Sequence, residues 1–327
     1  MSAPLEAVST AVQSSVLFAY LADDAYRTNG PFYPRVVAYY GISYGASSLL
    51  LAVCGYVLPM LLSNEHDMAT TALLLATAFS ALGFCAALKV PDIRPAHRRD
   101  NCWLRQRAAL SCMLRKRAGN GRSVLLLLLL FNVCAGPGMQ DFLGVYTLAN
   151  PFSWTGTDLA TYEFYATLAQ ILGYSLCAAL FRQLLGFSYG ALITVSGASA
   201  CGSALVIALS SKTWHMYLGL WFEMTCAGTV GAIEKVAQEL VEPDEMGKVL
   251  AMLSMANSAN FLIQRVGLNE VYKQTVASFP PAAWYIYAAL TATVTVVWAV
   301  WGNGLYSEKP PLAEPRNSDY GTLENAS

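Results

Sequence analysis

Long apolar runs separated by short polar segments dominate the chain between residues 36 and 303. Each of eight runs comes close to the roughly 20 apolar residues that a helix needs to cross a bilayer. A ninth run, at 8–22, is less apolar. The pattern predicts an all-α, polytopic membrane protein with about nine transmembrane helices. The eight longer runs are 36–61, 69–91, 123–147, 161–181, 186–210, 214–236, 247–264 and 281–303.

The composition agrees with this pattern. Hydrophobic residues make up 55% of the 327 positions and charged residues only 13%, whereas a soluble domain usually has about 25% charged residues. The formal net charge is −1, so the chain has no general attraction for nucleic acid. The expected surroundings are a lipid bilayer, and no nucleic-acid partner is expected.

Lys and Arg residues predict the orientation. Lys89 and the loop 92–122 hold ten of the twenty basic residues, and segments on the same side of an alternating topology add seven more. Only Lys212, Arg265 and Lys273 fall on the other side. Cytoplasmic loops are the positive ones, so loop 92–122 and the C-terminus are expected in the cytosol. Within this loop, residues 103–117 are either a basic helix on the lipid surface or an ordinary positive loop.

A helix-breaking sequence interrupts the run 123–147. Gly136, Pro137 and Gly138 stand in its middle, followed by Gln140 and Asp141. Proline removes a backbone donor and clashes with the preceding turn, and transporters use broken helices of this kind near their substrate sites. The segment is therefore interpreted as a cavity-lining helix with a hinge. The alternative is a packing kink that leaves Asp141 at the outer membrane interface.

Glu223 and Glu234 are two carboxylates in or near the run 214–236. They are eleven residues apart, which places them on nearly the same face of a continuous helix. A charged group at membrane depth usually faces a cavity or a partner, so the pair predicts a proton or cation path. For Glu234 the alternative is a charged helix end in the cytosol.

Asp23 is followed by Arg27 at helical i,i+4 spacing, which favours a simple ion pair.

Polar residues near 257–265 are expected to have structural roles. Asn257 and Asn260 lie about one helical turn apart and suit hydrogen bonds between helices, and the Arg265 side chain is expected to reach the outer rim of the membrane.

The three histidines are not at metal-ligand spacing, and no nucleophile or phosphate-loop motif is present. No enzymatic activity, metal or cofactor is expected.

Four sequence blocks resemble a known family. They are `LAD` at 21–23, `GMQDFLGVYTLANPFSWTGTDLATY` at 138–162, `ELVEPDEMGKVLAMLSMANS` at 239–258 and `SFPPAAWYIYAAL` at 278–290. With them the chain resembles the major facilitator superfamily, and more narrowly the solute carrier 46 family, which holds the proton-coupled folate transporter and its relatives. The likeness runs over most of residues 8–303.

The resemblance implies a twelve-helix fold in which two six-helix halves enclose a substrate cavity. The nine runs would be helices four to twelve, and the first three helices would be absent. Residues 1–91 would then form a partial N-terminal bundle, 92–122 a cytosolic loop and 123–303 the C-terminal six-helix bundle. The polar, proline-containing segment 304–327 is expected to be a disordered cytosolic tail.

The chain departs from the family at positions linked to proton coupling. The family's glutamate in the fifth helix aligns at or near Tyr40, its histidine in the seventh at Gly136, and its basic residue in the tenth at or near Glu234. Asp23 and the Gln140–Asp141 pair remain. A glutamate in place of a cation weakens attraction for a dianionic folate, so the resemblance implies a different or less acidic substrate.

These observations predict a secondary transporter, or symporter, of an organic solute that works by alternating access. Proton coupling and a folate-, haem- or organic-anion-like substrate stay open. The alternative is a non-transporting or truncated membrane protein that regulates a full-length relative. Tyr320–Leu323, `YGTL`, matches a sorting signal, so the plasma membrane and the endolysosomal membrane are both candidates. The predicted path comprises Asp141, Gln140, Glu223, Glu234 and Asp23, with Gly136, Pro137 and Gly138 as hinge.

Overall fold

The structure, a computed structural model, describes residues 102–306 except 118, 136–139, 150, 227 and 243–244, together with Thr71. The described residues form helices and short connections, and no strand occurs among them. The predicted all-α class is confirmed for this part of the chain. Asp23, the predicted hinge Gly136–Gly138 and the tail after residue 306 lie outside the described residues.

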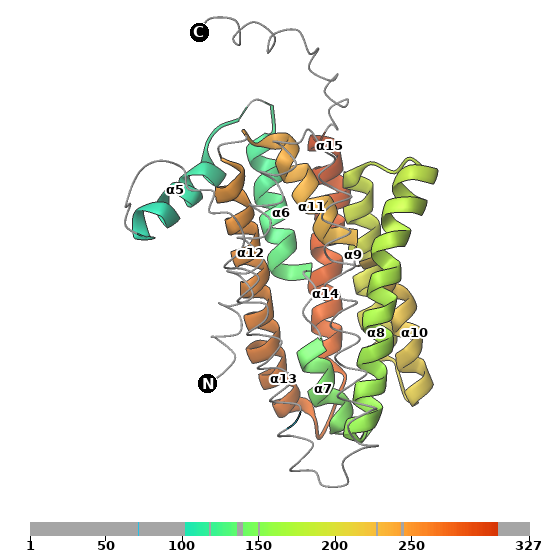
Figure 1. Cartoon of the computed structure of the whole chain (residues 1–327). Coiled ribbons are helices and arrows are strands. Elements are labelled where there is room, and N and C mark those ends of the chain that lie inside the picture. Colours follow the sequence, from blue (N-terminus) through green and yellow to red (C-terminus); the bar gives the residue numbers. More distant parts are fainter. Residues whose placement is uncertain are drawn as a thin grey trace, which may run out of the picture.

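The helices form an elongated bundle with roughly aligned axes (Figure 1). Three of them continue into π-helical segments, which carry the labels η2, η3 and η4. In chain order the elements are α5 (Cys102–Leu114), α6 (Gly121–Ala135), α7 (Gln140–Leu148), α8 (Gly156–Leu176), η2 (Cys177–Leu184), α9 (Tyr189–Ala208), α10 (Thr213–Cys226), α11 (Gly228–Leu240), α12 (Met246–Leu262), η3 (Ile263–Leu268), α13 (Asn269–Thr275), α14 (Ala282–Val297), η4 (Trp298–Gly302) and α15 (Asn303–Leu305).

Two helices of the described part are long and apolar enough to cross a membrane: Tyr189–Ala208 and the continuous helix Ala282–Leu305. They match the predicted runs 186–210 and 281–303. Two such helices are weak evidence for a membrane, because long core helices of soluble proteins meet the same criterion. Gly121–Ala135 is a shorter apolar helix.

Local sequence signals explain where two of the long helices begin. Thr155 is the N-cap of α8, and its hydroxyl accepts a hydrogen bond from the Asp158 backbone N–H at 3.2 Å while Asp158 accepts one from the Thr155 N–H at 2.9 Å. This reciprocal pair is a capping box. Ser188 caps α9 through the Ala191 N–H. Gly186, in the turn before it, has φ +67°, a conformation that glycine adopts without strain.

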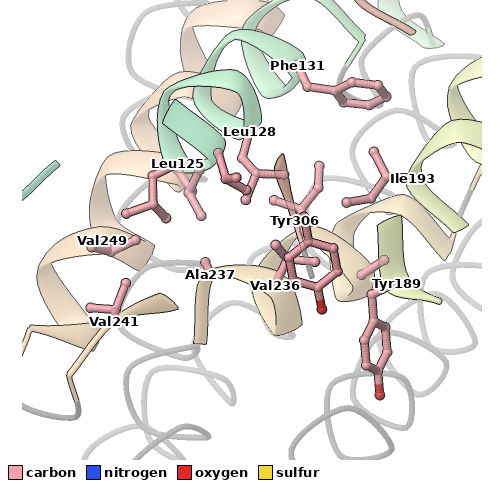
Figure 2. Close-up of a cluster of buried hydrophobic side chains, with 14 of the residues drawn as sticks. Leu125, Leu128, Phe131, Tyr189, Ile193, Val236, Ala237, Val241, Val249 and Tyr306 are labelled. Atoms are coloured by element: carbon pink, nitrogen blue, oxygen red, sulfur yellow. The ribbon is translucent and has the colours of Figure 1, made fainter. Parts of the chain in front are cut away.

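The buried apolar side chains form two groups at opposite ends of the bundle. The first, called the aliphatic cluster, joins α6, α9, α11 and α12 near the end where α15 lies, and Leu125, Leu128 and Val249 meet there (Figures 1 and 2). Its buried members also include Met113 of α5 and Tyr306. The C-terminal part of the short helix α5 is therefore packed against the bundle.

The second group, the aromatic cluster, fills the end at which α7 and α13 lie (Figure 1). Phe142 of α7 has its ring 5.2 Å from that of Trp284 and 5.8 Å from that of Tyr272, centroid to centroid. Rings at such distances attract each other in tilted or edge-to-face geometry. A second set of ring contacts, from Trp154 to Tyr162 at 5.5 Å, extends the cluster to α8. The cluster thus ties four helices together at this end.

Candidate functional site

Helix α8 and its continuation η2 approach α10 and the start of α11 closely at two glycines. A Cβ atom added to Gly173 of α8 would collide with the backbone carbonyl of Met224 in α10. A Cβ atom on Gly228, at the start of α11, would meet the thiol of Cys177 at 2.5 Å. Small residues allow this approach wherever helices pack backbone to backbone. We call this contact the glycine seam.

Side chains of α9 hydrogen-bond to the backbone of α10 beside the glycine seam. Ser196 Oγ donates to the Thr225 carbonyl at 2.9 Å, and Ser199 Oγ donates to the Phe222 carbonyl. Cys177 Sγ also reaches the Thr225 carbonyl, at 3.5 Å. Such bonds between helices add to the van der Waals contact of the backbones. The last turn of α10 is therefore held from two sides, by α8–η2 and by α9.

Glu223 lies one turn before the end of α10 and has a partner on α8. Gln170 Nε2 donates a hydrogen bond to Glu223 Oε1 at 2.9 Å, and Gln170 is buried. Within the described part, Gln170 Oε1 and the buried hydroxyl of Tyr162 make no hydrogen bond. A carboxylate, an amide oxygen and a phenol on these two helices thus have capacity for further hydrogen bonds. Gln170 was not among the predicted site residues.

Glu234 is the second carboxylate of the predicted path. It lies on α11, which packs against α9, α12 and α6, and only 5% of it is exposed. Its Oε2 accepts no hydrogen bond within the described part of the chain. The neighbouring Lys235 pairs instead with Glu239 at 3.6 Å. Glu234 is therefore a buried side chain, and the charged end of the helix begins after it.

The two glutamates contact different helices. Glu223 accepts a hydrogen bond from Gln170 of α8, whereas Glu234 lies on α11, which packs against α9, α12 and α6. Ala227, between α10 and α11, lies outside the described residues. The expectation that Glu223 and Glu234 share one helix face stays a prediction.

Gln140 and Asp141 open α7, which packs against α8, η3 and α13. This placement puts the predicted pair at the end of α7 that follows the predicted hinge. Among the described residues, no group of three or more His, Cys, Asp and Glu side chains lies close enough to hold a metal ion.

Buried amides mark the junction of α12 and η3. Gln264 Nε2 donates to Asn260 Oδ1 at 2.6 Å, one turn earlier in the same span, and both side chains are buried. This bond lies within one continuous helix, so the expected hydrogen bonding of Asn260 between helices stays a prediction. Arg265 is partly buried in η3, and its carbonyl accepts a bond from Asn269 Nδ2 at 2.6 Å.

A group of ion pairs joins α5 to the start of α12. Arg115 Nη1 donates to Glu245 Oε1 at 2.8 Å, and Arg117 Nη1 lies 2.9 Å from Glu245 Oε2. Arg117 Nη2 also donates to the Cys112 carbonyl at 2.9 Å, at the C-terminal end of α5. Burial alone would raise the pKa of the Glu245 carboxyl, but hydrogen bonds from Arg117 and Arg115 outweigh it, so this pKa lies below its ordinary value of 4.5. We call this group the arginine clamp.

Comparison of the chain with protein-family models gives no match, and comparison with curated proteins gives no significant match.

Proposed function

We propose that the chain is a polytopic membrane protein that moves a small organic solute across the bilayer by alternating access. The observation that carries this proposal is the presence of two carboxylates, the partly buried Glu223 and the buried Glu234, within the helix bundle. Placing a charged group at membrane depth costs several kcal/mol, roughly 2.5 to 3.5 on insertion scales, and such groups usually serve a substrate or ion path.

The local contacts of Glu223 support a role in this path. A single amide hydrogen bond from Gln170 orients the carboxylate. Tyr162 and the free Gln170 oxygen add a donor and an acceptor on the same helix, α8. A solute that carries hydroxyl, amide or amine groups would find complementary partners here. The path that we propose includes Gln140 and Asp141 of α7, with the segment Gly136–Gly138 as its hinge.

The resemblance to the solute carrier 46 family supports the same proposal and narrows it. In that reading residues 123–303 form the C-terminal half of a major facilitator transporter, with loop 92–122 and the C-terminus in the cytosol. Folate-, haem- and organic-anion-like solutes are the candidate classes, with a proton as the candidate coupling ion. Glu234 in place of the family's basic residue favours the less acidic members of these classes. The plasma membrane and the endolysosomal membrane are the candidate locations.

The test is uptake by the purified full chain in proteoliposomes, with labelled members of each solute class and an imposed pH gradient. We expect saturable uptake that falls by about tenfold or more in Glu223→Gln and in Glu234→Gln, equivalent to about 1.4 kcal/mol or more. Glu270→Gln is the matched control, because Glu270 is exposed on α13 and pairs with Lys273 at 3.7 Å near the helix surface. It should leave uptake unchanged.

Two results would count against the proposal in different ways. Saturable uptake with the same rate and the same pH dependence in Glu223→Gln and in Glu234→Gln would remove the carboxylates from the path. A complete lack of uptake for all solute classes, from protein that is folded and inserted, would favour the non-transporting regulator instead.

A further inference from the structure

We infer that α5 is a membrane-surface helix whose outward face binds anionic lipid headgroups of the cytosolic leaflet. This inference rests on the membrane-spanning part of the proposed function but not on transport. Four observations carry it: the exposure pattern of α5, its attachment to the bundle, its charge and its position.

Among the described side chains of α5, those of 107 and 109–114, the exposed ones form one stripe along the helix. Arg107, Leu110, Ser111 and Leu114 are exposed, and their spacing of three, four and seven residues places them on one face. Leu110 is 48% exposed and Leu114 51%. The opposite face packs into the bundle, where Ala109, Cys112 and Met113 are buried. The two leucines therefore point away from the protein, on a helix whose other side is already occupied.

The arginine clamp fixes this orientation. Arg117 binds both the last turn of α5, through the Cys112 carbonyl, and Glu245 at the start of α12. Met113 is fully buried in the aliphatic cluster. With its C-terminal end held at these points, α5 cannot rotate its leucines inward without breaking ion pairs and exposing Met113. The outward face is therefore a fixed surface.

The charge of the segment is complementary to an anionic leaflet. Residues 102–122 contain six basic residues and no Asp or Glu. Glu245 engages Arg115 and Arg117, while Arg107 and Lys116 are exposed at the two ends of the leucine stripe. A helix with cations beside a short apolar stripe lies in the interface, with its apolar side chains in the acyl boundary and its cations among the headgroups. Juxtamembrane basic segments are attracted to anionic lipids in the same way.

The position of α5 agrees with this arrangement. Figure 1 shows α5 projecting sideways from the bundle at the end where α12 begins and α15 ends. This end is the cytosolic one in the proposed orientation. Among the side chains of α5 that the structure describes, the exposed apolar ones are two leucines, and two side chains expose far less than the roughly 800 Å² per partner of a standard protein interface. A lipid surface thus suits the face better than a second protein.

The experiment is amide hydrogen–deuterium exchange of the full chain in nanodiscs made of phosphatidylcholine alone or mixed with phosphatidylserine. We expect exchange in residues 103–114 to slow by about threefold or more with phosphatidylserine and to lose this slowing at high salt, because exposed charges are screened within about 10 Å at 0.1 M salt. The double variant Arg107→Gln/Lys116→Gln should abolish the difference. Lys273→Gln, an exposed base at the opposite end, is the matched control and should keep it.

A second variant tests the apolar half of the face. Leu110→Ser/Leu114→Ser removes side chains that are half exposed, so the fold should persist while α5 exchanges faster in both lipids. Equal exchange of wild-type α5 in the two lipids would overturn the inference. So would a slowing that depends on protein concentration, which would indicate a protein partner. Because the readout needs only a chain that co-elutes with nanodiscs, a failure of transport and a failure of lipid binding are separate results.

Discussion

The aliphatic and aromatic clusters fill opposite ends of one bundle with different side chains and different polar contacts. Beside the aliphatic cluster, charged groups join segments distant in sequence: Arg117 pairs with Glu245, and the Tyr306 hydroxyl donates to Glu239 at 2.7 Å. The aromatic cluster is held mainly by ring contacts, and the indole N–H of Trp284 has no acceptor in the described part of the chain. One end therefore depends on ion pairs that respond to pH, and the other on the shape of large rings.

The largest expected effect concerns the rings. Trp284→Ala should lower the free energy of unfolding by about 4 kcal/mol, because removing a buried ring leaves a cavity that its neighbours fill only in part. The measurement is denaturant-induced unfolding of the purified chain in detergent, followed by circular dichroism. Trp301→Ala is the matched control, because Trp301 is 61% exposed, and it should cost less than about 1 kcal/mol. Similar losses in both variants would mean that ring contacts do not hold this end together.

A smaller effect is expected at the glycine seam, between the two clusters. Gly173→Ala should cost about 2 kcal/mol, because the new methyl group meets the Met224 backbone and α8 must move away from α10. Gly267→Ala serves as control, since a Cβ atom there meets nothing within 4 Å, and helical Gly→Ala is neutral or slightly stabilising. Unfolding in the same detergent measures both. A neutral Gly173→Ala would show that the two backbones are not in close contact.

Local patterns in the sequence were sufficient to predict the positions of the two helices that are both long and strongly apolar. The run 186–210 became Tyr189–Ala208 and the run 281–303 became Ala282–Leu305, because apolar length and end signals such as the Ser188 cap are local properties. For the basic segment 103–117 the sequence allowed either a surface helix or an ordinary loop. The structure shows a helix over Cys102–Leu114. Its lipid-surface role stays a prediction.

Contacts between distant residues could not be predicted in this way. Gln170 and Glu223 are 53 positions apart, and Arg115 and Glu245 are 130 positions apart, so no spacing rule relates them. The π-helical segments were also missed. At the start of η4, Trp298 donates its indole N–H to the Gly190 carbonyl of α9 at 3.0 Å, a contact that the sequence around Trp298 does not show. The nine-helix arrangement and the solute path stay predictions.

The smallest expected effect tests the pH response of the arginine clamp. Glu245→Gln should lower the free energy of unfolding by about 1 kcal/mol at pH 7, because the glutamine amide oxygen still accepts a hydrogen bond and because Arg115, one of the two partners of the buried Glu245, is 59% exposed. The pKa of Glu245 is lower in the folded protein than its ordinary value of 4.5, so protonation opposes folding. The stabilisation that the Glu245 carboxylate provides is complete above its unfolded-state pKa. It is lost as the pH falls through the lower folded-state pKa.

Wild type and Glu245→Gln should therefore differ in melting temperature at pH 7 and converge as the pH is lowered below about 4, which thermal unfolding in detergent at several pH values would measure. Glu270→Gln, with its exposed pair on α13, should stay close to wild type throughout. Trp284→Ala should show a deficit that is the same at each pH, since no charge is lost. The melting temperature of Glu245→Gln could instead lie below that of wild type by the same amount at each pH. Glu245 would then stabilise α12 through packing alone, and the two ends of the bundle would not differ in their response to pH.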